Sequence, residues 1–82
     1  MAKLYKTNGE IVEDINIDTI DRMQNWVGGY IELVPVQGKP EYVAIVNEEG
    51  LLLNLDYNEN ASSYAGIDLV GNVIICKRDE IY

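Results

Sequence analysis

The sequence predicts one small α+β domain spanning residues 1–82, with an antiparallel or mixed sheet of four to six strands and two short helices. Three observations lead to this fold class. Short segments rich in β-branched residues are separated by Asn, Gly and Pro. One segment instead repeats its apolar residues at helical spacing. A chain of 82 residues has room for one hydrophobic core.

A hairpin is expected at the N-terminus. Residues 3–7 and 10–15 are strand-like, and Asn8-Gly9 between them suits a two-residue type I′ turn, whose central positions both need positive φ. Such a turn would place Tyr5 opposite Val12 and Lys3 opposite Asp14.

The first helix follows this hairpin. Asp18 is the expected N-cap, and Gly28-Gly29 should end the helix. Apolar residues between them form one stripe that should be buried: Ile20, Met23 and Val27, with Trp26 beside them.

Two strands are expected next, at residues 30–36 and 41–47. Pro35 lacks a backbone N–H, so its strand should lie at an edge of the sheet or be bulged. Residues 47–50 resemble a type I turn, and Leu51–Leu55 are expected to form another strand.

The C-terminal part predicts a second, shorter helix and a central strand. Asn58 can cap the helix, which should end before Gly66. Residues 73–77 are apolar enough for a strand in the middle of the sheet. We expect both helices on one face of that sheet, as is usual in α+β folds.

Composition narrows the possible chemistry. The net charge is −8, and the basic residues are scattered, which disfavours direct binding of nucleic acid. The chain has one cysteine, Cys76, and no histidine. An intrachain disulfide and nucleophilic catalysis with a histidine base are therefore excluded, and no metal or other cofactor is expected. Cys76 should be a buried structural residue.

Localisation and assembly can also be anticipated. The N-terminus lacks an apolar signal region and no apolar run approaches the roughly 20 residues that span a bilayer, so we expect a cytoplasmic protein that does not contact membranes. Small domains often compensate for a limited core by self-association, and a homo-oligomer is expected on that ground.

Asp56-x-Asn58-x-Asn60 imitates the start of a calcium-binding loop. The pattern then fails, because Ala61 occupies the required glycine position and Ile67 stands where the bidentate glutamate should be. Helix capping explains these residues better.

The aromatic residues are Trp26 and six tyrosines, with no phenylalanine. Tyrosine and tryptophan suit half-buried positions with one polar end. Ordinary packing and a binding surface are both compatible with this set. For a binding surface we favour Tyr57 and Tyr64, which flank the second helix.

Asn58-Glu59-Asn60-Ala61 and the later Gly71-Asn72 carry a family resemblance. From Ile11 to Cys76 the chain resembles DUF3846, a family of unknown function found in bacteria and phages, with an Asn-Pro-x-Ala motif followed by Gly-Asn. Glu59 replaces the proline of that motif, and either residue suits the first helical position. The motif is interpreted first as architecture, with a pocket lining as the alternative.

The phage setting implied by the resemblance, with the absence of catalytic groups, suggests a protein that is not an enzyme. We expect it to counter host defence by sequestering a nucleotide-like immune signal, with no direct nucleic-acid contact. Aromatic side chains would stack on the base, and basic or amide groups would meet the phosphates. The candidate ligand-binding residues are Arg22, Trp26, Tyr57, Asn58, Asn60, Tyr64, Asn72, Lys77 and Arg78.

Two alternatives remain. The chain could inhibit a host defence nuclease, a protein partner, by imitating nucleic acid with Asp14, Asp18, Asp21, Glu48 and Glu49. A clustered acidic face would favour that function. The chain could also be an accessory structural protein.

Overall fold

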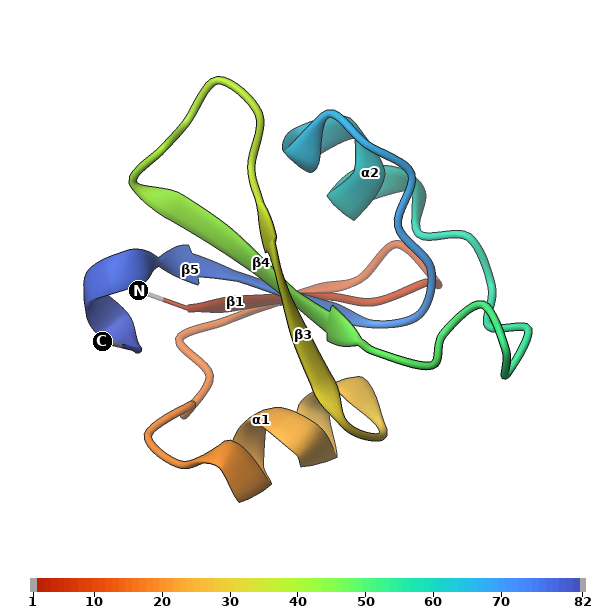
Figure 1. Cartoon of the computed structure of the whole chain (residues 1–82), viewed down its shortest axis with the longest axis horizontal. Coiled ribbons are helices and arrows are strands. Elements are labelled where there is room, and N and C mark those ends of the chain that lie inside the picture. The colour runs from red at the N-terminus through yellow and green to blue at the C-terminus, as the bar shows by residue number, and fades with distance from the viewer. Residues whose placement is uncertain (1, 82) are drawn as a thin grey trace.

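A computed structural model describes residues 2–81 and shows one five-stranded antiparallel sheet with two α-helices (Figure 1). Tyr82, one of the six tyrosines, lies outside the described residues, as does Met1. The elements in chain order are β1 (Lys3–Tyr5), β2 (Ile11–Glu13), α1 (Ile20–Val27), β3 (Ile31–Pro35), β4 (Tyr42–Asn47), α2 (Glu59–Ala65), β5 (Val73–Lys77) and the 3₁₀ turn η1 (Arg78–Glu80). The predicted α+β class is confirmed.

The strand order is β2-β1-β5-β4-β3. The closing strand β5 lies in the centre, between β1 and β4, as its apolar sequence indicates. The strand that contains Pro35 is β3, and it lies at an edge, where a missing backbone donor costs no ladder hydrogen bond. Both of these predictions are confirmed.

The N-terminal hairpin forms, but its register differs from the expected one. Lys3 lies opposite Glu13 and Tyr5 opposite Ile11. The amide of Gly9 donates to the carbonyl of Lys6 at 3.1 Å, and the amide of Lys6 donates to the carbonyl of Glu10 at 2.9 Å. The loop therefore has three residues, 7–9, and ends in a glycine with φ of 93°. Three-residue hairpin loops commonly end in such a left-handed glycine, and the predicted two-residue turn was wrong.

The N-cap of α1 is Thr19, one residue later than predicted. Its hydroxyl accepts a hydrogen bond from the amide of Arg22 at 3.2 Å. Asp18 instead forms an ion pair of 3.1 Å with the Arg22 side chain. Either residue type can cap a helix, so the local sequence does not distinguish Asp18 from Thr19. Gly28 ends the helix with φ of 84°, as predicted.

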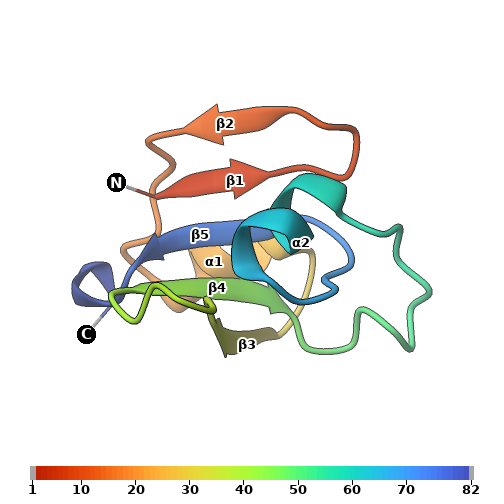
Figure 2. The same ribbon diagram turned by 90° about the horizontal axis from the view of Figure 1, so that it is seen from above.

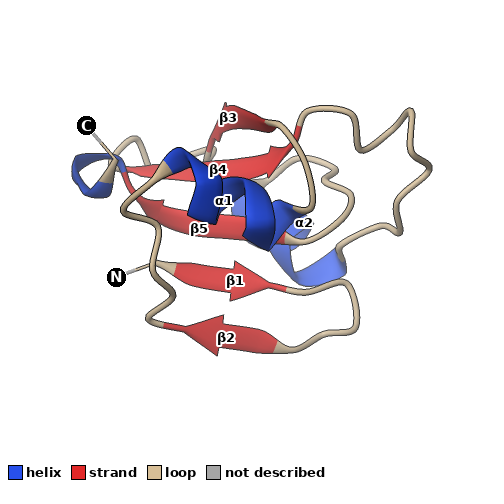
Figure 3. Ribbon diagram, turned by 90° about the horizontal axis from the view of Figure 1, so that it is seen from below, coloured by secondary structure: helices blue, strands red, loops and turns tan. Residues whose placement is uncertain are grey.

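The two helices lie on opposite faces of the sheet, and the expectation of one shared face was wrong. Figure 2 shows α2 in front of the sheet, and Figure 3, from the other side, shows α1 in front. The reason lies in β4 and β5, where Val43–Val46 and Val73–Cys76 are apolar at successive positions. Because successive strand residues point to opposite faces, these strands need a cover on both sides.

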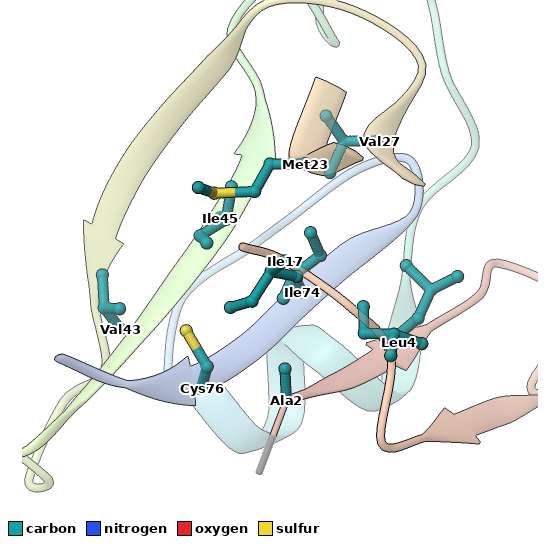
Figure 4. Close-up of a cluster of buried hydrophobic side chains, with 10 residues drawn as sticks. Ala2, Leu4, Ile17, Met23, Val27, Val43, Ile45, Ile74 and Cys76 are labelled. Atoms are coloured by element: carbon teal, nitrogen blue, oxygen red, sulfur yellow. The ribbon is translucent and has the colours of Figure 1, made fainter. Parts of the chain in front are cut away.

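Two separate cores result. Beneath α1, Met23 and Val27 pack with Ile45, Ile74 and other side chains (Figure 4). The expectation that Ile20 is buried with them was wrong, because this first residue of the helix is 60% exposed. Beneath α2, the core consists of Tyr5, Val36, Ala44, Val46, Ala61, Ala65, Leu69, Val73 and Ile75. Cys76 is fully buried in the first of these cores, which confirms its structural role.

The segment Leu51–Leu55 is not a strand. Residues 51–54 form consecutive turns, and Asn54 has a left-handed φ of 59°. The apolar content of this segment favoured a strand. Leu51, Leu52 and Leu53 are exposed, however, and the segment pairs with no strand of the sheet. The preceding turn at residues 47–50 is present, with the amide of Gly50 donating to the carbonyl of Asn47.

Within residues 2–81, neither helix has the length and apolar character required to cross a membrane.

Candidate functional site

Asn58 is completely buried and joins three segments of the chain. Its amide nitrogen donates to the carbonyl of Tyr5 at 2.7 Å and to that of Gly71 at 2.8 Å. Its side-chain oxygen accepts from the amide of Ala61 at 3.1 Å, which caps α2. Both amide hydrogens are in use, so a ligand could reach this side chain only by replacing structural bonds. The geometry supports the architectural interpretation of the motif.

The neighbouring motif residues have similar structural contacts. The Ser62 hydroxyl accepts from the amide of Leu69 at 2.7 Å and donates to its carbonyl at 3.2 Å. The Asn72 side-chain oxygen accepts from the amide of Thr7 at 3.2 Å. Asn60 is exposed, with one long contact of 3.4 Å to the carbonyl of Gly9. The bonds of Asn60 and Asn72 attach α2 and the approach to β5 to the first hairpin.

A cluster of tyrosine and lysine side chains lies on the α2 face of the sheet; we call it the basic-aromatic patch and define it as Lys39, Tyr42, Tyr64 and Lys77. The rings of Tyr42 and Tyr64 meet edge to face, with centroids 6.1 Å apart. The Lys39 ammonium lies 3.9 Å above the centre of the Tyr64 ring, and the Lys77 ammonium lies 6.0 Å from that of Tyr42. Each cation is within the range of a cation–π interaction.

The loop that carries Lys39 is held in place at both ends. The amide of Gln37 donates to the carbonyl of Ala65 at the end of α2, at 3.0 Å. The Arg78 side chain donates from Nε to the carbonyl of Pro40 at 2.8 Å. These two bonds position Lys39 over Tyr64. They also leave the terminal nitrogens of Arg78 available beside the patch.

The basic side chains divide into two groups. Lys3, Lys6 and Arg22 each form an ion pair, with Glu13, Glu10 and Asp18 respectively. Within the described part of the chain, no ion pair of 4.0 Å or less is formed by Lys39, Lys77 or Arg78. Two of these three residues belong to the patch, and the third, Arg78, bonds the loop that carries Lys39. In a chain of charge −8 they form a local group of positive charge.

Two of the nine predicted ligand-binding residues, Tyr64 and Lys77, therefore belong to this patch, and Arg78 adjoins it through its bond to Pro40. Lys39 and Tyr42 were not among the predicted residues. Tyr42 follows the loop directly in sequence, but only the pairing of Tyr42 with Lys77 across β4 and β5 brings it to the patch. No local signal distinguishes Lys39 from the other lysines.

Arg22 and Trp26 lie elsewhere, on α1 and thus on the opposite face of the sheet. With Asn25 they line a hollow of about 230 Å³. The Trp26 indole donates to the carbonyl of Asn16 at 2.9 Å. These residues cannot contact the same small ligand as the basic-aromatic patch.

The second hollow is lined by Thr7, Val27, Leu55, Asp56, Gly71 and Asn72. It contains one predicted residue, Asn72. Asp56 is the charged group in its lining, so an anionic ligand is disfavoured there. Tyr57 is exposed, pairs with Val70 through an isolated bridge, and donates its hydroxyl to Asp68 at 3.4 Å.

The acidic residues considered for nucleic-acid mimicry fall at two ends of α1. Asp18 and Asp21 accompany the start of the helix. Glu48 lies beyond its end, where the amide of Glu48 donates to the carbonyl of Tyr30 at 2.8 Å.

Cys76, the one thiol of the chain, lies in the core beneath α1 and not at the patch. Burial raises the pKa of the Cys76 thiol from 9.0 to about 11, so it is a protonated, weak nucleophile at neutral pH. In residues 2–81, no three side chains of His, Cys, Asp or Glu are arranged to hold a metal ion.

The fold and these contacts define a small three-layer α+β protein in which the Asn58 cap joins the hairpin, the short helix and the approach to the central strand. A model of the family DUF3846, a domain of unknown function, matches residues 1–81. The chain belongs to this family. Comparison with curated proteins and with solved structures gave no match.

Proposed function

We propose that the protein binds a small, phosphate-bearing, nucleotide-like ligand at the basic-aromatic patch and does not convert it. The observation that carries the proposal is the placement of two ammonium groups, Lys39 above Tyr64 and Lys77 near Tyr42, neither of which forms an ion pair within the described residues. Arg78 is attached to the same loop through its bond to Pro40. Ammonium and guanidinium groups recognise phosphate oxygens, and tyrosine supplies a ring and a hydroxyl.

The patch has features that suit binding. Its loop is attached to α2 and to Arg78, so little conformational entropy needs to be lost on binding. Tyr64 also contacts Tyr5 at 6.1 Å between ring centroids, which supports the ring from the sheet side. The Lys39 ammonium can either remain above Tyr64 or turn to a phosphate, because it has no ion-pair partner to give up.

The biological role follows from the phage setting that the sequence resemblance implies. A protein that holds a nucleotide-like signal without turnover would lower the free concentration of that signal. We therefore propose counter-defence by sequestration, in the cytoplasm of the host. Retention without reaction is consistent with the burial and raised pKa of Cys76.

The test is isothermal titration of the protein with a panel of cyclic nucleotides and ADP-ribose derivatives. A Lys39→Ala/Lys77→Ala variant should lose at least about tenfold in affinity for any ligand that binds, because two charge-assisted contacts are removed. Lys3→Ala/Lys6→Ala is the matched control, since it removes the same charge from side chains engaged in ion pairs.

Three results would contradict the proposal. One is the absence of binding across the whole panel. Another is an equal loss of affinity in the two double variants, which would show a general charge effect rather than a site. Product formation, monitored by chromatography of the recovered ligand, would contradict sequestration and indicate an enzyme.

A further inference from the structure

Three consecutive leucines are exposed in the turn segment between β4 and α2. Leu51 is 83% exposed, Leu52 84% and Leu53 55%. We call residues 50–55 the leucine loop. In Figures 1 and 2 the chain between β4 and α2 projects beyond the end of the sheet. Single exposed leucines are common on soluble proteins, but three adjacent ones form a contiguous apolar surface that favours association.

The leucine loop has a defined hydrogen-bonded structure. The amide of Leu55 donates to the carbonyl of Gly50 at 3.0 Å and so closes the loop at its base. Within it, the amide of Leu53 donates to the carbonyl of Glu49 at 2.9 Å, and that of Asn54 to the carbonyl of Leu51 at 3.2 Å. The backbone that carries the leucines is thus hydrogen-bonded before any partner arrives, which lowers the entropic cost of binding.

Close packing attaches the base of the loop to the domain. A methyl group added at Gly71 would lie 2.8 Å from a methyl carbon of Leu55, and one added at Gly50 would lie 2.8 Å from a methyl carbon of Val70. Leu55 therefore fills the space beside Gly71, while the three leucines before it face outward. Leu55 therefore anchors the loop to the domain, and the other three leucines are exposed to solvent.

Acidic residues border the leucine loop on both sides in the sequence. Glu48 and Glu49 precede it and Asp56 follows it, and all three are exposed. Across residues 2–81, none of them takes part in an ion pair of 4.0 Å or less. The apolar surface therefore has an acidic border whose negative charges are not neutralised by ion pairs within the described residues.

We propose that the leucine loop docks into an apolar groove bordered by lysine or arginine on a partner protein. The leucines would supply the buried apolar contact, and the acidic border would supply orientation and rapid association. This interaction surface is separate from the basic-aromatic patch and does not depend on the nucleotide-like ligand.

The charges decide between this partner and two other occupants. A second copy bound through the same loop would bring Glu48, Glu49 and Asp56 of both chains together, and the chains each carry −8. An anionic lipid surface would likewise repel the acidic border. A basic border on the partner is the arrangement that removes the repulsion.

The probe is a helical peptide of leucine and lysine, with leucines along one face and lysines at the borders of that face. Its affinity for the full chain is measured by fluorescence anisotropy, beside a scrambled peptide of the same composition. Leu51→Ser/Leu52→Ser should weaken binding of the helical peptide at least about tenfold, since two apolar side chains are no longer buried. Ile20→Ser/Leu33→Ser removes two exposed apolar side chains elsewhere and should leave the affinity unchanged.

A second pair of variants tests the acidic border. Glu48→Gln/Glu49→Gln should reduce the salt dependence of peptide binding, whereas Glu32→Gln/Glu41→Gln, an equal charge change at other exposed positions, should retain it. Circular dichroism of each variant confirms that the fold is retained.

Four outcomes would overturn the proposal. The scrambled peptide could bind as tightly as the helical one, or Leu51→Ser/Leu52→Ser could bind like the unaltered chain. Sedimentation could show an oligomer that only Leu51→Ser/Leu52→Ser dissociates, which would assign the loop to a second copy. Vesicles of phosphatidylcholine could bind more strongly than the peptide in a Leu51-dependent manner, which would assign it to a membrane.

Discussion

The side chain of Asn58 donates a hydrogen bond of 2.7 Å to the carbonyl of Tyr5, a residue 53 positions earlier in the chain. The same amide group bonds the carbonyl of Gly71, so one side chain connects the end of β1, the approach to β5 and the start of α2. An N-cap ordinarily serves its own helix. Here it also holds the helix against the sheet, and the basic-aromatic patch depends on that placement because Tyr64 belongs to α2.

Replacement of Asn58 by alanine should therefore cost more than the loss of a cap. We expect the free energy of unfolding to fall by about 3 kcal/mol, because two buried carbonyl oxygens also lose their donors. Urea unfolding followed by circular dichroism measures the change. Asn60→Ala, which removes one exposed contact of 3.4 Å, should cost less than about 0.5 kcal/mol. Equal effects of the two changes would contradict the joining role of Asn58.

The three-layer arrangement can be tested at two adjacent positions of β5. Ile74 packs beneath α1 and Ile75 beneath α2. Ile74→Ala and Ile75→Ala should each lower the free energy of unfolding by about 2–5 kcal/mol, since both leave a cavity in a core. Leu33→Ala, at a partly exposed position of the edge strand, should cost clearly less in the same thermal or urea experiment. Tolerance of either core substitution would show that one face is not covered.

Alkaline pH should destabilise the protein through Cys76. The folded-state pKa of its thiol, about 11, lies above the ordinary value of 9.0 because burial disfavours the thiolate. Between these two pH values the thiol of the unfolded chain loses its proton first. The contribution of Cys76 to the free energy of unfolding is therefore fully present below pH 9 and is lost as the pH rises toward 11. The difference between 9.0 and about 11 corresponds to a loss of about 2–3 kcal/mol from this group once the pH has reached 11.

The control for this pH effect is Cys76→Ala, which lowers stability at every pH but removes the thiol. Its stability should decline less steeply over the same range when both proteins are unfolded in urea. Tyr5, whose pKa is also raised chiefly by burial, adds to the alkaline loss in both proteins. Parallel pH curves would therefore contradict a contribution from Cys76.

The hairpin loop makes a separate prediction at Gly9. Its φ of 93° disfavours any residue with a β-carbon, and no neighbouring atom lies within 4 Å of the position where that carbon would be. Gly9→Ala should thus cost about 1–2 kcal/mol from backbone strain alone. Gly9→Asn should cost less, because asparagine adopts left-handed conformations more readily. The two variants are compared by thermal unfolding, and equal stability of Gly9→Ala and the unaltered chain would refute the strained loop.

Sequence patterns with a local cause were interpreted correctly. Asn58 and Gly66 delimit α2 because capping depends on a few consecutive residues. Pro35 indicated an edge strand because it lacks a donor. Two errors arose where local choices were nearly equal. Thr19 and Asp18 are both good caps, and Asn8-Gly9 suits a two-residue or a three-residue loop.

Larger errors arose where the outcome depended on distant contacts. The unbroken apolar run in β5 already indicated burial on both faces, and that signal could have placed the helices correctly. Leu51–Leu55 has the composition of a strand, yet no strand is available to pair with it. Strand composition describes suitability for a sheet, whereas pairing requires a partner.

The amino-acid sequence by itself determined the α+β class, the caps of α2, the central position of β5 and the family, because each depends on local chemistry or on a short motif. Tertiary structure alone decided which face each helix covers and which basic residues meet. Lys39, Tyr64 and Lys77 come from a loop, a helix and a strand, so their meeting depends on how those elements pack. Packing joins residues by distance in space, which no local pattern of residues encodes.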